Sequence, residues 1–598
     1  MRGPTAFAAQ RERRKVRTGA EPARPADDRR GETRDVDGVV PSTAGEPLTA
    51  PTDPSSRRGA TAAAVSESSR GGRPGALSPF RYRIFCALWT AMLLSNLGWM
   101  IQSVGISWMM ASIGASADVV ALVQASITLP IMLFALVAGA VADNFDRRRL
   151  MLVSQIFNCA AASGLAVCIY LGFVTPWLLL AFTFLISSGA AISGPAWQSL
   201  VGEIVPRREI PSAIAINAVG FNIARTVGPA IGGMILAAAG PFAGFVTNAL
   251  SYIPLIVVLS LWRPPERRHP LPPENLRSAI IAGICFVSQS PGILAVLLRG
   301  AAFGVAASSF QSLLPLIARD SVGGGPLTFG LLLGSFGIGA ICGAFVITRL
   351  RRSLSLEGTV RLAFLGFAYA TAIAGLSSAV ALTASGALVG GASFVLVLSS
   401  LNATVQLSTP RWVVGRALAV YQMATFGGMA LGSWIWGNVA EHLSVTSALM
   451  ASAACLVLGA ALGIRFGLPD SLSLDLDPAD RREEPDISLS IRPHSGPIIV
   501  TVEYLIREAD EADFLAAMSE VRRIRRRDGA RRWTLLRDLS DAKIWIERYQ
   551  SPTWLDHIRQ NHRLTRADVV ASERVLALHE GPDAPRIRRT IEQTRLSQ

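Results

Sequence analysis

The chain has 598 residues, of which 50 % are hydrophobic and only 17 % are charged, and its mean hydropathy is +0.39. Soluble globular domains carry about 25 % charged residues, so this composition excludes an ordinary soluble protein. The formal net charge of +14 is typical of nucleic-acid-binding proteins. However, the sequence contains no zinc-finger, homeodomain or RNA-recognition pattern, and many arginines lie in short gaps between apolar segments. We therefore expect no nucleic-acid partner.

The N-terminal segment, residues 1–79, is rich in Pro, Gly, Ser, Ala and Arg. Such a composition buries too little apolar surface to fold alone, and it predicts a disordered tail. The segment lacks the short apolar core and small-residue cleavage site of a secretory signal peptide.

Long apolar segments dominate the chain from residue 84 to residue 465. A helix needs about 20 apolar residues to cross a bilayer. Twelve candidates meet this length, at residues 84–111, 117–141, 150–173, 176–200, 212–239, 242–262, 294–317, 327–347, 359–379, 381–402, 416–438 and 444–465. The fold class predicted is an all-α polytopic membrane protein with twelve transmembrane helices.

The arginines between these segments predict the orientation. If the N-terminus is cytoplasmic, the opposite loops contain Arg319 alone. All other loop arginines are then cytoplasmic, namely Arg147, Arg148, Arg149, Arg207, Arg208, Arg263, Arg267, Arg268, Arg277, Arg349, Arg351, Arg352 and Arg411. By the positive-inside rule, both termini are expected on the cytoplasmic side of the cell (inner) membrane.

The membrane region repeats itself at a spacing of 204 residues. This offset relates separate clusters, pairing Gly139 with Gly343, Arg147 with Arg351, Arg148 with Arg352, Pro206 with Pro410, Gly228 with Gly432 and Gly233 with Gly437. We therefore predict two six-helix halves, residues 80–263 and 293–468, joined by a cytoplasmic linker at 264–292. Two such halves are typical of alternating-access transporters, which hold the substrate between them near the midplane.

Two motifs give this region a family resemblance. Gly139-x-x-x-Asp143-x-x-Asp146-Arg147-Arg148 resembles the loop 2–3 signature of the major facilitator superfamily, with Asp146 in place of the usual glycine. Ala224-x-x-x-Gly228-Pro229-Ala230-Ile231-Gly232-Gly233 is similar to the span-five signature of its exporters, with Ala224 in place of the first glycine. The surrounding sequence resembles the transmembrane secretion effector branch, which contains the enterobactin exporter.

The resemblance implies conformational roles for both motifs. Asp143 and Arg147, with Gly139, Asp146 and Arg148 around them, would belong to a charge cluster that closes the cytoplasmic side. An acid at a helix C-terminus opposes the helix dipole, so Asp143 is expected to need a cationic partner. The arginines could instead be only a topology anchor.

The span-five signature has a packing interpretation and a sealing interpretation, which are compatible. Small residues let helix backbones approach closely, as Gly228, Gly232 and Gly233 would, and Pro229 would bend the helix. The resemblance adds that this bend seals the periplasmic side.

Arg225 is predicted to lie mid-span, where charges are expensive and usually mark a substrate path or an ion pair. No Asp or Glu lies in the middle of a span, so Arg225 could bond carbonyls, Asn222, Gln side chains or an anionic or phenolic substrate. Gln102 and Gln422 could line the same path, together with Gln124, Gln311 and Asn402. Interhelical hydrogen bonding is the alternative interpretation for all of them.

Energy coupling is expected to use protons, an expectation carried by the resemblance alone. The sequence contains no GxxxxGK[ST] loop for ATP. Its six cysteines and six histidines show no metal-ligand spacing, so no metal and no cofactor are predicted.

The C-terminal region reads as a small soluble domain. After a linker at 469–496, residues 497–582 show strands near 500–506, 532–537 and 543–549, helices near 514–524 and 554–558, and a last strand in "ERVLALH" at 573–579, followed by a tail at 583–598. The order βαββαβ predicts a ferredoxin-like α+β domain. It resembles the antibiotic-biosynthesis-monooxygenase domain, whose members pair into dimers, so a homodimer through this domain is possible.

These observations predict a secondary exporter that moves an amphiphilic small molecule, such as a siderophore, drug or other secondary metabolite. No catalytic residues are assigned, and the chain is not expected to be an enzyme. Two alternatives stay open: an importer, and a membrane-tethered sensor or enzyme that acts through the C-terminal domain with His557, His562, His579, Trp533, Trp545 and Tyr549 around a pocket.

Overall fold

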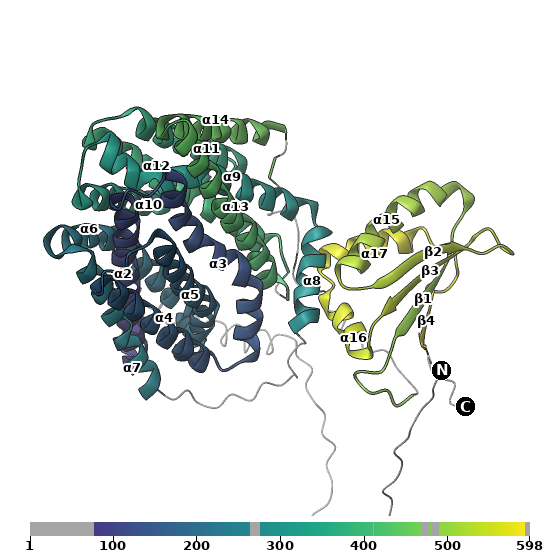
Figure 1. Ribbon diagram of the computed structural model, residues 1–598. Helices are drawn as coiled ribbons and strands as arrows, with labels where there is room; N and C mark the ends of the chain where they lie inside the picture. The colour runs from purple at the N-terminus through teal and green to yellow at the C-terminus, as the bar shows by residue number, and fades with distance from the viewer. Residues whose placement is uncertain are drawn as a thin grey trace, which may run out of the picture. The chain divides into compact units, whose positions relative to one another are not determined.

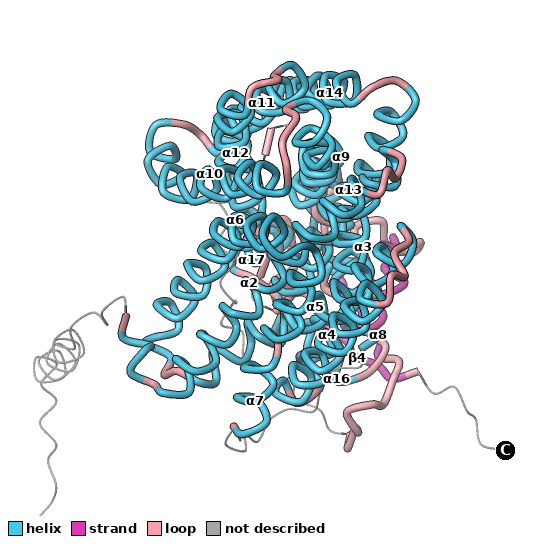
Figure 2. Tube along the Cα trace, turned by 60° about the vertical axis from the view of Figure 1, so that its left-hand side comes forward, coloured by secondary structure: helices cyan, strands magenta, loops and turns pink. Residues whose placement is uncertain are grey.

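A computed structural model describes residues 77–262, 276–410, 412–465, 467–468, 476, 479 and 489–592. The predicted tail at 1–79 lies outside the described residues except for its last three positions. A short 3₁₀ helix, η1 (Ser78–Arg81), precedes a bundle of long helices (Figures 1 and 2).

The first half of the bundle contains α2 (Arg83–Ser112), α3 (Ala117–Asn144), α4 (Arg147–Tyr170), α5 (Pro176–Ile204), α6 (Ile210–Ser251) and α7 (Ile253–Leu261). The second half contains α9 (Pro291–Leu316), α10 (Pro326–Ser353), α11 (Leu356–Leu376), α12 (Val380–Leu407), α13 (Val414–His442) and α14 (Val445–Arg465). Between them, α8 (Leu276–Ser288) occupies part of the predicted linker, where no helix was expected.

Eleven of the predicted apolar segments each overlap one helix of the bundle, and the segment 242–262 covers the end of α6 and all of α7. Among the described residues, ten helical stretches are long and apolar enough to cross a membrane. One of them, the 52 residues Ile210–Leu261, contains two of the predicted segments, because the backbone leaves the helical region at Gly240 (φ 74°). The helix α13 is 29 residues long and coincides with the predicted segment 416–438, although it is not one of the ten.

The repeat of 204 residues reappears in the packing. Gly228 of α6 contacts Met100 of α2, and its counterpart Gly432 of α13 contacts α9 at Val305. Each of these contacts lies within one half. Gly233 and its counterpart Gly437 instead face the opposite half: a Cβ on Gly233 would lie 2.8 Å from the carbonyl oxygen of Pro326 in α10, and one on Gly437 would lie 2.9 Å from the Cα of Asp118 in α3. Equivalent glycines therefore make equivalent contacts.

The bundle has two distinct ends. At one, which we call the glycine-turn end, the chain reverses at Gly114, Gly172, Gly240 and Gly323, all with φ between 68° and 78°. Only glycine adopts this conformation without a steric penalty. At the other, the arginine end, helices are joined by residues 145–146, 205–209, 354–355 and 408–413.

The outer surface of the bundle is apolar. Large side chains remain exposed along the helices, including Val219 (55 %), Phe345 (72 %) and Leu458 (63 %). A continuous apolar surface of this kind is unfavourable in water and matches the hydrocarbon core of a bilayer.

The C-terminal region forms a four-stranded antiparallel sheet in the order β2-β3-β1-β4. Its elements are β1 (Ile498–Leu505), α15 (Glu511–Arg527), β2 (Arg531–Arg537), β3 (Ile544–Ser551), α16 (Trp554–Arg563), α17 (Arg566–Ala577) and β4 (Arg586–Ile591). Alternate residues of β1 are buried, and Phe514, Met518 and Val521 of α15 lie in the same core cluster as the buried residues of that strand.

The strand predicted at 573–579 is wrong, because most of these residues belong to α17. Thr565 and Asp568 form a capping box that starts this helix, and Ala571 and Val575 are buried one turn apart. A capping box and an i, i+4 apolar pair specify a helix. The last strand is β4, which lies beyond the predicted domain end at residue 582.

Candidate transport site

Asp146 starts a helix. Its carboxylate accepts hydrogen bonds from the backbone N–H groups of Arg148 (2.9 Å) and Arg149 (3.3 Å), which have no partner within α4. An Asp at this position stabilises a helix by about 1 kcal/mol. The residue that departs from the family signature therefore serves the local fold, and an Asp directly before a helical segment is a sequence signal that could have indicated this role.

Arg147 and Arg148 tie α4 to other helices of the same half. The Arg147 guanidinium pairs with the carboxylate of Glu203 near the end of α5. Arg148 donates from Nε to the carbonyl oxygen of Leu259 (2.6 Å) and from Nη2 to that of Ser260 (2.9 Å), at the end of α7. A cation is favourable beside the last carbonyls of a helix. Both arginines thus stabilise the first half at its arginine end.

Asp143 lies in the last turn of α3, and its side chain lies outside the described residues. Gly139 lies one turn earlier, and a Cβ there would meet no other atom within 4 Å. The role of Asp143 in a closing charge cluster remains a prediction.

The span-five glycines pack α6 against two different helices. Gly228 and Gly232 contact α2 of their own half, at Met100 and at the backbone of Ile101. Gly233 contacts α10 of the opposite half, where a Cβ on Gly330 would lie 2.6 Å from the carbonyl oxygen of Pro229. Small residues at a helix crossing allow this approach of backbones. The motif therefore holds the two halves together near the glycine-turn end.

A second crossing lies near the same end. A Cβ on Gly437 would lie 2.7 Å from the Cβ of Ala121, and Glu441 accepts a hydrogen bond from the backbone N–H of Ala117 (2.6 Å). These contacts join α13 to α3. The halves therefore meet through two related crossings, α6 with α10 and α13 with α3.

Arg225 lies in the middle of α6 and reaches the second half. Its guanidinium carbon is 5.3 Å from the ring centroid of Phe336 in α10 and 5.2 Å from that of Phe394 in α12. The side chain is half-buried. Sequence reasoning identified this arginine but not its aromatic partners, because they lie more than 100 residues away in the chain.

The other predicted path residues have separate environments. Gln102 is 2 % exposed and accepts a hydrogen bond from Asn248 of its own half, and Asn222 donates to the carbonyl oxygen of Ala218 (2.8 Å). Gln422 is half-buried in α13. The structure gives no contact that joins these three side chains to Arg225.

Two further polar contacts join different helices, and the first is between two residues of the predicted path. Gln124 of α3 donates to Gln311 of α9 (3.3 Å), which is a hydrogen bond between the halves. Arg299 of α9, 8 % exposed at its side chain, pairs with Glu357 of α11 (3.0 Å). An arginine five residues after the start of the apolar segment 294–317 was a sequence signal for this buried ion pair.

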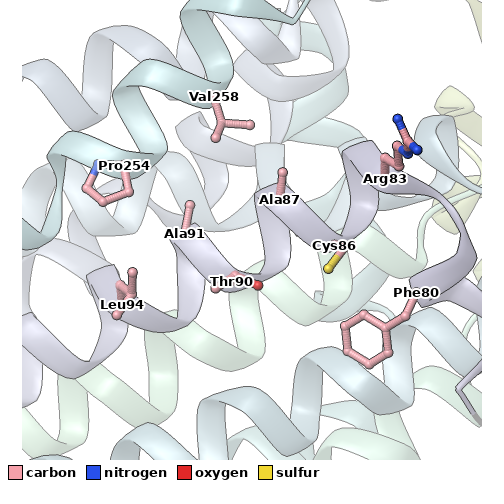
Figure 3. A pocket seen from close by; sticks show the side chains of 9 residues that line it. All are labelled: Phe80, Arg83, Cys86, Ala87, Thr90, Ala91, Leu94, Pro254 and Val258. Atoms are coloured by element: carbon pink, nitrogen blue, oxygen red, sulfur yellow. The ribbon is translucent and has the colours of Figure 1, made fainter.

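A groove of about 510 Å³ lies between α2 and α7 (Figure 3). Phe80 and Arg83 lie toward one end of it, and Leu94 and Pro254 toward the other. Its walls belong to the first half alone. It therefore lies away from the crossings between the halves, and we assign no transport role to it.

The C-terminal domain has a polar network inside its core. Glu547, 0 % exposed, accepts hydrogen bonds from Tyr504 (3.2 Å), Arg525 (3.3 Å) and Trp533 (2.9 Å). Burial and the neighbouring carboxylate raise the pKa of Tyr504 above its usual range. These groups satisfy one another, which is typical of a structural network.

Known proteins agree with this architecture. The family model described as "Transmembrane secretion effector" matches residues 74–597. The chain belongs to this family. It is thus a multi-pass membrane transporter of the major facilitator type, and its relatives include efflux proteins.

Three curated relatives share between 23 % and 28 % of their aligned residues with this chain. The uncharacterized MFS-type transporter YfiS of Bacillus subtilis is 25 % identical over 56 % of the chain and 82 % of its own length. Macrolide efflux protein A of Streptococcus pyogenes is 23 % identical over 44 % of the chain and 65 % of its own length. The multidrug efflux pump Tap of Mycobacterium tuberculosis is 28 % identical over 33 % of the chain and 49 % of its own length.

Solved structures confirm the fold of the bundle. A bacterial homologue of the human lysosomal transporter Spinster, in an inward-facing and occupied conformation, aligns with a TM-score of 0.53 at 14 % identity, over 65 % of this chain and 98 % of that one. The nucleoside transporter NupG aligns with a TM-score of 0.54 at 13 % identity, over 64 % of this chain and 100 % of that one.

Proposed function

We propose that this secretion effector family member exports an amphiphilic small molecule across the inner membrane by alternating access. Twelve membrane-spanning helices would form the transporter, if α6 is divided at Gly240 and α13 is counted. The arginine end would face the cytoplasm with both termini, and the glycine-turn end would face outward. The observation that carries the proposal is the pair of crossings, α6 with α10 and α13 with α3, that closes the glycine-turn end.

A transporter of this kind alternates between two packings of its halves. The glycine contacts at Gly233, Gly330 and Gly437 are specific to a state in which the outer end is closed. Opening that end separates backbones that now touch, and the charge cluster of Asp143 and Arg147 would then close the cytoplasmic end. Proton exchange is the energy source that the family resemblance favours.

The C-terminal domain is proposed to have a ferredoxin-like fold, supported by its sheet order β2-β3-β1-β4. A similarity to antibiotic-biosynthesis monooxygenases and a dimer through this domain remain part of the proposal. The buried hydrogen-bonded network around Glu547 favours an accessory role over catalysis.

A comparison of metabolites inside and outside cells tests the exporter. Cells would carry the wild type, a deletion, Asp143→Asn or Asp320→Asn at matched membrane levels. Asp320→Asn is the matched control, because Asp320 lies at the opposite, glycine-turn end and its side chain is 51 % exposed. One compound that accumulates inside the deletion and Asp143→Asn cells, but not inside the control, supports export and the charge cluster. Equal metabolite levels in wild type and deletion would contradict the exporter.

Removal of residues 469–598 tests the alternative that the C-terminal domain acts as a sensor or enzyme. Retained export by a stable truncated protein would make the domain accessory. Loss of export at an unchanged membrane level would assign it a function in transport.

A further inference from the structure

Arg225 occupies an unusual position for a charged side chain. It is 15 residues from each end of the helical stretch from Ile210 to Gly240, which is about 22 Å at 1.5 Å per residue. An arginine at the centre of a membrane helix raises the free energy of insertion by about 2.5–3.5 kcal/mol. Such residues usually face a polar path and serve a function.

The partners of Arg225 differ from those of the other arginine deep in the bundle. Arg299 has a carboxylate partner in Glu357, whereas the contacts described for the Arg225 guanidinium are the faces of Phe336 and Phe394. Asp and Glu between residues 80 and 465 occur only at positions 118, 143, 146, 203, 209, 266, 274, 320, 357 and 441. Those that the structure describes lie in loops or near helix ends.

The aromatic rings form a fixed surface. Phe336 stacks on Phe310 at 5.8 Å and meets Phe394 edge-on at 5.7 Å, and Phe394 is also 5.9 Å from Phe303. A cation gains about 0.5–2 kcal/mol over such a face. The rings cannot accept the directed hydrogen bonds that the five N–H groups of a guanidinium offer.

An anion would satisfy those N–H groups better. Carboxylates and related anions accept two parallel hydrogen bonds from one guanidinium, and these charge-assisted bonds are about twice as strong as neutral ones. The Arg225 side chain is half-buried, so its surface is not closed off. An acidic group therefore offers the guanidinium hydrogen bonds that the aromatic faces do not.

The position of Arg225 links this exchange to the closed end. A Cβ on Gly337 of α10 would lie 2.9 Å from the carbonyl oxygen of Arg225 and 2.7 Å from the Cα of Thr226. The next described glycine of α6 toward the arginine end, Gly220, packs on Trp89 of its own half instead. Arg225 thus lies where the glycine contacts between α6 and α10 end, and its ring contacts add to the closed interface.

We propose that the transported amphiphile carries an acidic group, that Arg225 binds this group, and that binding releases the guanidinium from Phe336 and Phe394. This inference rests on the proposed export function and names its substrate class. An anion favours the separation of the halves because it removes a contact that joins them. A neutral or cationic amphiphile gains no such interaction.

Two permanently charged dyes of similar shape test the proposal. Pyrene-1-sulfonate and (pyren-1-ylmethyl)trimethylammonium would be titrated against the full chain in nanodiscs, with fluorescence anisotropy as the readout and empty nanodiscs as the blank. The wild type is expected to bind the sulfonate at least tenfold more tightly. Arg225→Gln is expected to weaken sulfonate binding by about tenfold to a hundredfold, while Arg349→Gln, at an exposed position of α10, is the matched control and leaves it unchanged.

Phe394→Leu separates recognition from a structural role. Under the proposal it removes the competing contact, so sulfonate binding becomes tighter while Arg225→Gln makes it weaker. If Arg225 and Phe394 only stabilise the closed interface, both variants change sulfonate binding in the same direction. Arg225→Lys retains the charge without the planar fork, and intermediate affinity is expected of it if the glutamine variant does not fold.

Three results would overturn the proposal: a cation affinity equal to or above the sulfonate affinity, unchanged sulfonate binding in Arg225→Gln, or no binding of either dye. The metabolite comparison distinguishes failure of the anionic-substrate proposal from failure of the proposed export function. A non-acidic compound retained by deletion cells overturns the anionic substrate and leaves export intact. Absence of any retained compound contradicts export itself.

Discussion

Replacement of Gly330 by alanine should destabilise the contact between α6 and α10 near the glycine-turn end. The added Cβ would lie 2.6 Å from the carbonyl oxygen of Pro229 and 3.1 Å from the Cα of Gly233. Ordinary contacts between heavy atoms lie near 3.5 Å, so α6 and α10 must separate by up to about 1 Å. All of the atoms that block the methyl group are backbone atoms, which cannot rotate away.

The size of the effect follows from overpacking, which costs about 1–3 kcal/mol per inserted methyl group. Because the clash exists only when the halves touch, this free energy acts on the equilibrium between the closed and open states. At 1.4 kcal/mol per tenfold change, the ratio of open to closed outer ends should rise by roughly 5-fold to 150-fold.

Gly334→Ala is the matched control. It lies one turn away on α10, and its Cβ would have 3.4 Å to the carbonyl oxygen of Thr226, an ordinary contact. Spin labels at Ile113 and Leu443, which are 41 % and 74 % exposed at the same end in opposite halves, report the separation by pulsed electron resonance once the six native cysteines are replaced. Equal distance distributions for the two variants would refute the reasoning.

Three further predictions concern the arginine end and the C-terminal domain. Asp146→Ala should lower the free energy of unfolding by about 1 kcal/mol relative to Asp146→Asn, because Asn keeps the cap of α4. The melting temperatures of the two purified variants measure this difference, and equal melting temperatures would exclude the capping role. A double-mutant cycle of Arg147→Gln and Glu203→Gln should give a coupling free energy of about 0.2–1 kcal/mol in the same assay, because both side chains are about one-fifth exposed. Additive effects of the two substitutions would show that the ion pair contributes nothing to stability. Burial and the positive charges of Arg589 and Arg525 lower the pKa of His557 to about 4. The neutral His557 side chain therefore makes its full contribution to the free energy of unfolding above about pH 6.5, and this contribution falls as the pH drops toward 4. Between pH 6.5 and pH 4, the free energy of unfolding of His557→Gln should rise by up to about 3 kcal/mol relative to that of the wild type. Hydrogen exchange of the β1 amides measures this difference between the two proteins, and a difference that does not change with pH would contradict the prediction.

The membrane helices could be predicted from the sequence because a bilayer imposes a one-dimensional constraint. Twenty consecutive apolar residues must form a helix, since every backbone group has to be bonded within the segment. The 204-residue repeat also carried real structural information, as the equivalent contacts of Gly228 with Gly432 and of Gly233 with Gly437 confirm. Helix α8 was missed because 13 residues are too few for the span criterion.

In the C-terminal domain, local sequence patterns predicted one strand wrongly and missed another. The segment "ERVLALH" alternates enough to suggest a strand, but the capping box eight residues earlier, at Thr565, commits it to α17. Half of the residues in the true last strand, Arg586–Ile591, are arginines and most of the strand is exposed, so period-two burial could not reveal it. Its place in the sheet depends on pairing with β1, a contact almost 90 residues distant in the chain.

The sequence by itself determined where the long helices lie, that the chain repeats at a spacing of 204 residues, and that a charged residue lies within one of the apolar segments. The length of each apolar segment and the internal repeat are properties of the linear chain, so both can be read from the sequence. Only the tertiary structure decided what Arg225 contacts and near which end of the bundle the glycine contacts between α6 and α10 and between α13 and α3 lie. Those facts depend on contacts between α6 and α10, whose residues are about 100 positions apart, and no local pattern encodes a distance across an interface.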